Sequence, residues 1–196
     1  MSNAATLDRR EVLAAILKER GDALLVTGLG SSCFDAGVHD HPHTFYLWGG
    51  MGAAAMVGLG LALAQPRRRV LVVTGDGEML MGLGSLSTIG ARRPPNLSII
   101  VMDNEQYSET GMQATHTQQG VDLAQIAKAC NFALAQTVRT EDEVKACVPR
   151  LYDTAGPAFV AMKISTKRYP MSIKMRDGVH IKNRFREALL GQKAFD

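Results

Sequence analysis

The sequence has few of the features that mark secreted or membrane-spanning chains. Its three cysteines, Cys33, Cys130 and Cys147, are odd in number and have no Cys-x-x-Cys spacing, which favours free thiols in a reducing cytoplasm over a disulfide framework. Its longest weakly polar run, residues 45–64, contains five glycines, so we expect a buried helix there rather than a membrane span. No secretory signal is evident at the N-terminus. The net charge of +3 is too small to indicate nucleic-acid binding by itself.

The composition and the apolar pattern predict a folded α/β domain. Hydrophobic residues make up 46% and charged residues 21% of the 196 positions, as in a globular protein with a substantial core. Short segments rich in Val and Ile alternate with helical patterns, which predicts a doubly wound parallel sheet with helices on both faces. The expected strands are residues 23–27, 69–74, 97–102, 133–138 and 158–164. The expected helices are residues 8–20, 51–64, 79–90, 123–130, 141–152 and 183–190.

Three polar or glycine-rich segments directly follow expected strands. They are Gly28-Leu29-Gly30-Ser31, Gly75-Asp76-Gly77 and Asp103-Asn104. Ligands of doubly wound domains bind outside the carboxyl ends of the strands. We therefore expect these segments to meet at one edge of the sheet and to form the ligand site.

The segment Gly75-Asp76-Gly77 has three interpretations. It can be a tight strand-to-helix turn in which Asp76 caps the next helix. It can belong to a dinucleotide fingerprint, although neither it nor Gly28-Leu29-Gly30 completes the pattern G-x-G-x-x-G. It can also form a magnesium diphosphate site with Asn104, because carboxylate and amide oxygens are ligands of Mg²⁺. In that case the glycines let the backbone approach a phosphate, and the following helix N-terminus favours its negative charge.

The third interpretation leads to a family resemblance. Gly75-Asp76-Gly77 and Asn104, with 26 residues between them, resemble the thiamine-diphosphate motif of decarboxylases and related enzymes. The resemblance extends to the aminopyrimidine-binding segment, which looks like "LWGGMGAAAMVGLGLAL", and to the part after the metal site, which looks like "DNEQYSETGMQATHT" followed by "DLAQIAKACNF". The motif usually has Asn-Asn where this chain has Asp103-Asn104, which keeps the ligand position.

The resemblance implies cofactors and a role for each matching residue. The implied cofactors are thiamine diphosphate and Mg²⁺, with Asp76 and Asn104 binding the metal through side-chain oxygens and Gln106 through its carbonyl. Met51 would lie beneath the cofactor and hold it bent, although a Met at this place can also be core filling. The Gly49 carbonyl would accept a hydrogen bond from the 4′-amino group. The other implied cofactor-binding residues are Gly28, Ser31, Gly50, Gly75, Gly77, Glu78 and Tyr107.

The resemblance also implies an activity and a partner. The implied reaction is decarboxylation of a 2-oxoacid, as in family members that act on sulfopyruvate or phosphonopyruvate, and carboligation to 2-hydroxy-ketones or acetolactate is the alternative. In this family a separate pyrimidine-binding domain supplies an activating glutamate, and the resemblance covers only the diphosphate-binding domain, here residues 1–165. We therefore expect an α subunit to supply that glutamate in an α2β2 or larger assembly, with residues 51–64 in the interface.

Several histidines are candidates for further roles. His39, His41 and His43 alternate, so an extended segment would place them on one face. They can form a transition-metal site, provide a catalytic acid, with His43 as the candidate, or lie in a polar surface loop. His116 follows Asn104 in a loop that could close over the substrate, and it is either a catalytic candidate or an exposed loop residue.

The C-terminal tail, residues 166–196, is basic and contains the last expected helix. From Lys163 onward the chain has nine Lys or Arg residues against three acidic residues. The tail can be a solvated surface that packs on the domain or on the partner. It can also recognise a second anionic group of the substrate, because Arg donates paired hydrogen bonds to oxyanions. Nucleic-acid binding is disfavoured, because few aromatic residues are interleaved with the charges.

Two hypotheses from other classes remain at this point. A non-catalytic cofactor-binding module would keep the fold without turnover, but the presence of both Asp76 and Asn104 argues against it. A plain nucleotide-binding protein would bind NAD or ATP rather than thiamine diphosphate. Both are distinguished from the enzyme by ligand binding and by assays with candidate partners.

Overall fold

The computed structural model describes residues 7–173 and 176–194, and it confirms the predicted doubly wound α/β fold. Six parallel strands form the main sheet in the order β2-β1-β3-β4-β8-β7, and two short antiparallel strands, β5 and β6, form a hairpin. The strands are β1 (Leu24–Thr27), β2 (Thr44–Tyr46), β3 (Val70–Gly75), β4 (Leu97–Asp103), β5 (Gln106–Tyr107), β6 (Gln113–Ala114), β7 (Leu134–Val138) and β8 (Ala158–Lys163).

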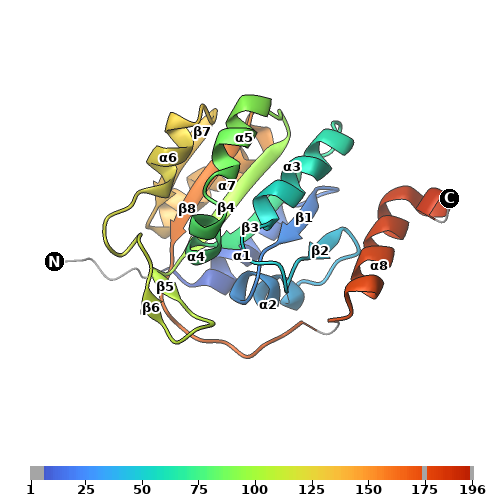
Figure 1. The fold of residues 1–196 in the computed structure, drawn as a ribbon. Coiled ribbons are helices and arrows are strands. Elements are labelled where there is room, and N and C mark those ends of the chain that lie inside the picture. Colours follow the sequence, from blue (N-terminus) through green and yellow to red (C-terminus); the bar gives the residue numbers. More distant parts are fainter. Residues whose placement is uncertain (1–6, 174–175, 195–196) are drawn as a thin grey trace.

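Helices cover both faces of this sheet (Figure 1). One core cluster joins the sheet to α1, α2 and α7, and the other joins it to α3, α4, α5 and α6. The helices are α1 (Arg9–Lys18), α2 (Ser31–Val38), α3 (Ala54–Ala64), α4 (Asp76–Met81), α5 (Ser85–Arg92), α6 (Leu123–Ala129), α7 (Glu141–Asp153) and α8 (Gly178–Leu190), followed by a 3-10 turn (Gly191–Ala194).

The central strands are apolar along their whole length because both of their faces are buried. In β3 the side chains of Val70 and Val72 enter one core, and those of Leu71 and Val73 enter the other. All four are fully buried. This continuous burial is the physical reason that parallel strands appear in the sequence as unbroken apolar runs.

Three parts of the predicted element pattern were wrong or incomplete. The segment expected to be a loop before residue 51 contains α2 and β2, and the loop expected after Asn104 contains the β5–β6 hairpin. The single helix expected at residues 79–90 is divided into α4 and α5. These elements are short, so their local preferences are weak and tertiary contacts decide them. In α2, for example, buried Asp35 forms ion pairs with Arg9 and Arg10 of α1.

Helix α8 packs against the edge strand β2 and begins five residues before the expected helix at 183–190. The rings of Phe45 and Phe185 meet edge to face, with their centroids 5.6 Å apart. Trp48 donates a hydrogen bond to the carbonyl of Arg176, and Arg184 forms an ion pair with Asp40 at 2.9 Å. None of the helices in the described ranges is both long and apolar enough to cross a membrane.

Gly90 allows α5 to lie directly against the end of α6. A Cβ at this position would lie 1.7 Å from the carbonyl oxygen of Cys130, whereas a Cβ on Gly60 of α3 would meet nothing within 4 Å. We expect Gly90→Ala to lower the free energy of unfolding by about 1–3 kcal/mol or more, because the backbones must separate. Gly60→Ala is the control and should raise it by about 0.5–1 kcal/mol. Urea unfolding of both variants measures the contrast, and equal effects would contradict this packing argument.

Candidate functional site

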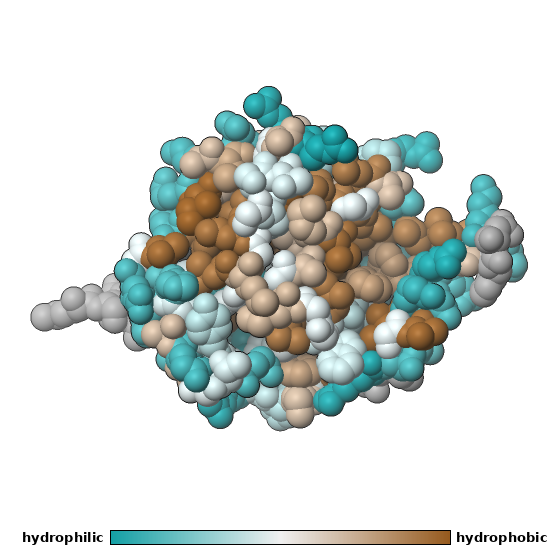
Figure 2. Space-filling view, in the orientation of Figure 1, coloured by the Kyte–Doolittle hydropathy of each residue, from teal (hydrophilic) through white to brown (hydrophobic). Residues whose placement is uncertain are grey.

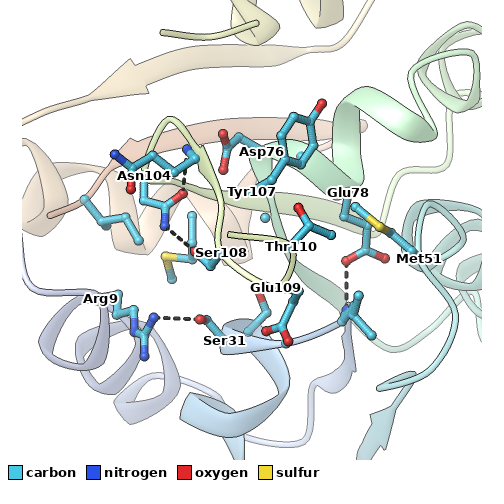
Figure 3. Close-up of a pocket in the computed structure, with 18 residues that line it drawn as sticks. Arg9, Ser31, Met51, Asp76, Glu78, Asn104, Tyr107, Ser108, Glu109 and Thr110 are labelled. Atoms are coloured by element: carbon cyan, nitrogen blue, oxygen red, sulfur yellow. Dashed lines mark hydrogen bonds between the residues drawn. The ribbon is translucent and has the colours of Figure 1, made fainter. Parts of the chain in front are cut away.

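The carboxyl ends of β1, β3 and β4 border an open pocket, as predicted for this fold (Figure 3). Its empty volume is about 630 Å³ when the open solvent at its mouth is included. The segments at the ends of these three strands supply about half of the lining residues, and others come from the β5–β6 hairpin and from Arg9 of α1. Nine of the twelve residues predicted to bind the cofactor line it: Ser31, Met51, Gly75, Asp76, Gly77, Glu78, Asn104, Gln106 and Tyr107.

Asp76 is the first residue of α4 and is buried, with 2% of its surface exposed. Its carboxylate accepts a hydrogen bond from the hydroxyl of Thr115 at 2.6 Å, and the hydroxyl of Thr117 lies 3.4 Å from the same oxygen. Burial raises the pKa of this carboxyl to about 6, and the nearby Asp103 carboxylate adds to the rise. No Lys, Arg or His in the described ranges forms an ion pair with Asp76. The carboxylate is therefore suited to a bound cation.

Asp103, the departure from the usual motif, is neutralised by a lysine. Its carboxylate lies 2.7 Å from the ammonium of Lys163, which also contacts Glu105 at 2.7 Å. Burial alone would lower the pKa of Lys163, but the hydrogen bonds to Asp103 and Glu105 raise it above its ordinary value. Thr117 donates to the other oxygen of Asp103 at 2.8 Å. Asp103 and Lys163 thus form a structural ion pair beside the site.

Asn104 and Gln106 line the same pocket as Asp76. The Asn104 side-chain oxygen accepts from the amide of Gln106 at 3.0 Å, and its amide group donates to Ser108 at 2.9 Å. Between them, Glu105 has a positive φ of 64°. The Gln106 side-chain oxygen is buried and has no hydrogen-bond partner within the described residues. Together with Asp76, these oxygens are the donor types that a hard cation such as Mg²⁺ prefers.

Glu78 connects the turn after β1 to the end of β3. One carboxylate oxygen accepts from the amide of Leu29 at 2.9 Å and from the hydroxyl of Thr74 at 2.7 Å. Burial raises the pKa of Glu78, and these hydrogen bonds partly offset the rise. A Cβ on Gly28 would lie 1.8 Å from this oxygen. Gly28 therefore does not line the pocket itself but makes room for the side chain that shapes it.

The loop before α3 places Met51 at one end of the pocket, with 39% of its surface exposed. Gly52 has a φ of 83°, and its carbonyl oxygen would lie 2.3 Å from a Cβ on Gly82. Gly82 follows the last residue of α4. This close backbone contact ends α4 and fixes the loop that carries Met51 against the same helix that begins with Asp76. The predicted residues Gly49 and Gly50 lie in this loop but do not line the pocket.

Neither of the predicted catalytic histidines, His43 and His116, lines the pocket. His43 contacts the carbonyl of Ala188, at 3.2 Å, and the side chain of Arg68, at 2.9 Å. Burial lowers the pKa of His43. His116 is exposed, and neither residue lines the pocket. In the described ranges, no group of three His, Cys, Asp or Glu side chains is placed to hold a metal. The catalytic role of His43 and His116 remains a prediction.

Two of the residues that sequence reasoning missed are Thr115 and Thr117, on either side of His116. Both are buried, both contact Asp76, and Thr117 also contacts Asp103. The signal was the alternation in "ATHTQ", since an extended segment turns Thr115 and Thr117 to one side and His116 to the other. The hairpin before them holds the segment in place through a hydrogen bond from the Thr115 amide to the carbonyl of Glu105.

Comparison with known proteins agrees with this geometry. Residues 28–162 match the family model "Thiamine pyrophosphate enzyme, C-terminal TPP binding domain". The chain is 38% identical over 152 residues to "Sulfopyruvate decarboxylase subunit beta" of Methanocaldococcus jannaschii, with 78% of this chain and 80% of that protein covered. It is 39% identical over 164 residues to "Phosphonopyruvate decarboxylase" of Streptomyces viridochromogenes, with 83% of this chain but only 41% of that protein covered.

A solved structure supports the fold independently. Benzoylformate decarboxylase from Polynucleobacter necessarius superposes with a TM-score of 0.67 at 21% identity, and the match covers 84% of this chain and 34% of that one. At this identity the likeness concerns the fold alone. The matched fold is one part of that longer chain.

Proposed function

Because this chain belongs to the thiamine pyrophosphate enzymes, as their C-terminal TPP-binding domain, we propose that it is the diphosphate-binding β subunit of a decarboxylase of 2-oxoacids. The proposed reaction converts 3-sulfopyruvate and a proton into sulfoacetaldehyde and CO2. The observation that carries the proposal is the 38% identity to a named sulfopyruvate decarboxylase β subunit over 80% of that subunit's length. The pocket that joins Asp76 and Asn104 supports it.

The site supports thiamine diphosphate and Mg²⁺ as cofactors. When bound, thiamine diphosphate supplies a carbon nucleophile for the 2-oxo group and accepts the electron pair left by CO2. Asp76 and Asn104 would hold Mg²⁺ through side-chain oxygens and Gln106 through its carbonyl. Gly75 and Gly77 would let the backbone approach the diphosphate, and Met51 would provide an apolar surface for the rings. The buried Asp76 carboxylate, which has hydroxyl partners but no cationic one among the described residues, fits this role.

We further propose a pyrimidine-binding α subunit as partner, in an α2β2 or larger assembly within the cytoplasm. The subunit name of the relative supports a partner, and unpaired Cys33 and Cys147, both buried thiols, support a reducing compartment. Figure 2 shows apolar residues gathered over α3. Met51, Met56, Leu63 and Met81 are exposed large hydrophobic residues on or near this helix. Such surfaces on a single chain mark interaction sites.

The test is to assay CO2 release from 3-sulfopyruvate by the chain alone, by the candidate α subunit alone and by both, with thiamine diphosphate and Mg²⁺. We expect turnover only with both chains. Full activity of this chain alone would contradict the partner proposal. Preference for phosphonopyruvate would support the second candidate, which the Streptomyces relative favours. Formation of acetolactate or a 2-hydroxy-ketone on addition of an aldehyde would instead indicate a carboligase.

A further inference from the structure

A chain of hydrogen bonds joins Asp76 to the ion pair of Asp103 and Lys163. The Thr115 hydroxyl lies 2.6 Å from Oδ2 of Asp76 and 2.9 Å from the Thr117 hydroxyl. The Thr117 hydroxyl donates in turn to Oδ1 of Asp103 at 2.8 Å. The other oxygen of Asp103, Oδ2, lies 2.7 Å from the ammonium of Lys163. All five residues are buried, so water does not compete for these contacts and the network holds its members in one arrangement.

Both ends of this chain of hydrogen bonds are attached to regular secondary structure. Asp76 is the first residue of α4, whereas Asp103 and Lys163 are opposite each other in the paired strands β4 and β8. The segment between them is held by a hydrogen bond from the Thr115 amide to the carbonyl of Glu105. Threonine is branched at Cβ, which restricts its χ1 rotamers. The two hydroxyls therefore have little freedom to turn away from the carboxylates.

The threonine contacts lie on one oxygen of Asp76. The Thr115 hydroxyl and the more distant Thr117 hydroxyl, at 3.4 Å, are both directed at Oδ2. Neither of these hydrogen bonds involves Oδ1. Asp76 lines the pocket, whereas the two threonines and Asp103 do not. A carboxylate held from behind by one oxygen keeps the other for a ligand in the pocket, so the threonines set the direction in which Asp76 presents Oδ1.

We propose, on the basis of the proposed function, that Thr117 is a positioning residue for the Mg²⁺ site. Thr117 does not line the pocket, and it acts through Thr115, which it holds against Asp76. Groups that hydrogen-bond to a metal-ligating carboxylate fix its orientation, and loss of one typically lowers metal affinity by roughly 10- to 100-fold. Asp103 then has a definite role in this chain, since it accepts the Thr117 hydroxyl and leaves Asn104 to the metal.

Thr27 provides a matched control for this proposal. It is the last residue of β1, the strand next to β3 in the sheet, and it is fully buried. Its hydroxyl has no nitrogen or oxygen partner within the described residues. Thr27→Val is therefore the same chemical change as Thr117→Val, in the same sheet region, without the loss of a hydrogen bond to a second hydroxyl or to a carboxylate.

The experiment is calorimetric titration of Mg²⁺ into the full chain assembled with its α subunit, with thiamine diphosphate in excess. For Thr117→Val we expect the affinity for Mg²⁺ to fall by roughly 10- to 100-fold. Thr117→Ser keeps the hydroxyl and should bind Mg²⁺ within about threefold of wild type, as should Thr27→Val. At saturating Mg²⁺ the KM of Thr117→Val for 3-sulfopyruvate should be unchanged, because Thr117 does not line the pocket. If Thr117→Val does not fold, Thr117→Ala removes the same hydroxyl without the bulk of valine and should show the same loss.

Other outcomes overturn the inference. Unchanged Mg²⁺ affinity in Thr117→Val would mean that Thr115 alone fixes the Asp76 carboxylate. An equal loss in Thr117→Ser would assign the effect to packing of the threonine methyl group, and an equal loss in Thr27→Val would assign it to a general change in the fold. Wild-type chain that binds neither Mg²⁺ nor thiamine diphosphate with its partner would contradict the proposed function itself, a result distinct from failure at Thr117.

Discussion

Asp76→Asn is expected to abolish Mg²⁺-dependent binding of thiamine diphosphate and to stabilise the cofactor-free chain at pH 7.5. The loss of binding, at least about 100-fold, follows from removal of a charged metal ligand. The gain in stability follows from burial, because the charged carboxylate is costly at 2% exposure. Asn fills nearly the same volume and can still accept the hydrogen bond from Thr115. One substitution would therefore remove the function and improve the fold.

The pH dependence of this effect has a definite sign. Folding raises the pKa of Asp76 from 3.8 to about 6. The contribution of Asp76 to stability is therefore complete below about pH 4 and is lost as the pH rises through 6. The difference corresponds to roughly 3 kcal/mol of unfolding free energy at pH 7.5. Asp76→Asn should recover a large part of this at pH 7.5 and almost none at pH 4.

Urea unfolding of both proteins at pH 4.5, 6 and 7.5, without metal or cofactor, measures the effect. The stability difference should grow steadily with pH. Titration of Mg²⁺ and thiamine diphosphate into the wild type should show weaker binding below pH 6, where the carboxyl takes up its proton. An Asp76→Asn chain that is destabilised equally at all three pH values would show that the carboxylate has structural partners outweighing its burial.

The sequence predicted which segments border the pocket because these segments follow neighbouring strands. The apolar runs before Gly75 and Asp103 indicated two buried strands, and the parallel pairing of β3 with β4 joins Gly75 to Met102. That pairing brings Asp76 and Asn104 to the same edge. In such folds the position of a residue within its strand largely sets its position in the site, so the three segments that follow β1, β3 and β4 were predictable together.

The residues that tune the site were harder to predict because they depend on contacts distant in the sequence. Arg9 reaches Ser31 across 22 residues, and Lys163 reaches Asp103 from a different strand. Neither residue belongs to a local motif. The alternation of Thr115 and Thr117 was a local signal, but His116 between them was the more obvious catalytic candidate. Helix α2 was missed because its first turn is Ser-Ser and it contains Gly37, all weak helix formers.

Lys163→Met is the second substitution with a large expected effect, and it should lower the free energy of unfolding by about 3–5 kcal/mol. Lys163 and Asp103 are 7% and 2% exposed, and their charged groups lie 2.7 Å apart. Removing one member of a buried ion pair leaves the other charge uncompensated in the interior. Lys145→Met is a matched control, because Lys145 and its partner Asp142 are 73% and 92% exposed. It should change stability by less than about 0.5 kcal/mol.

A double-mutant cycle separates the ion pair from the packing of the lysine chain. Asp103→Asn restores the Asn-Asn usual in the family motif, and an amide needs no buried cation. The Lys163→Met/Asp103→Asn chain should therefore regain part of the stability lost by Lys163→Met alone, with a coupling energy of about 1–3 kcal/mol. Asp103→Asn should also lower the pKa of Asp76, because the Asp103 carboxylate contributes to its rise. If the stability changes of the two single variants simply add in the double variant, Lys163 stabilises the fold through packing of its buried side chain. Asp103 then does not need Lys163 as an ion-pair partner.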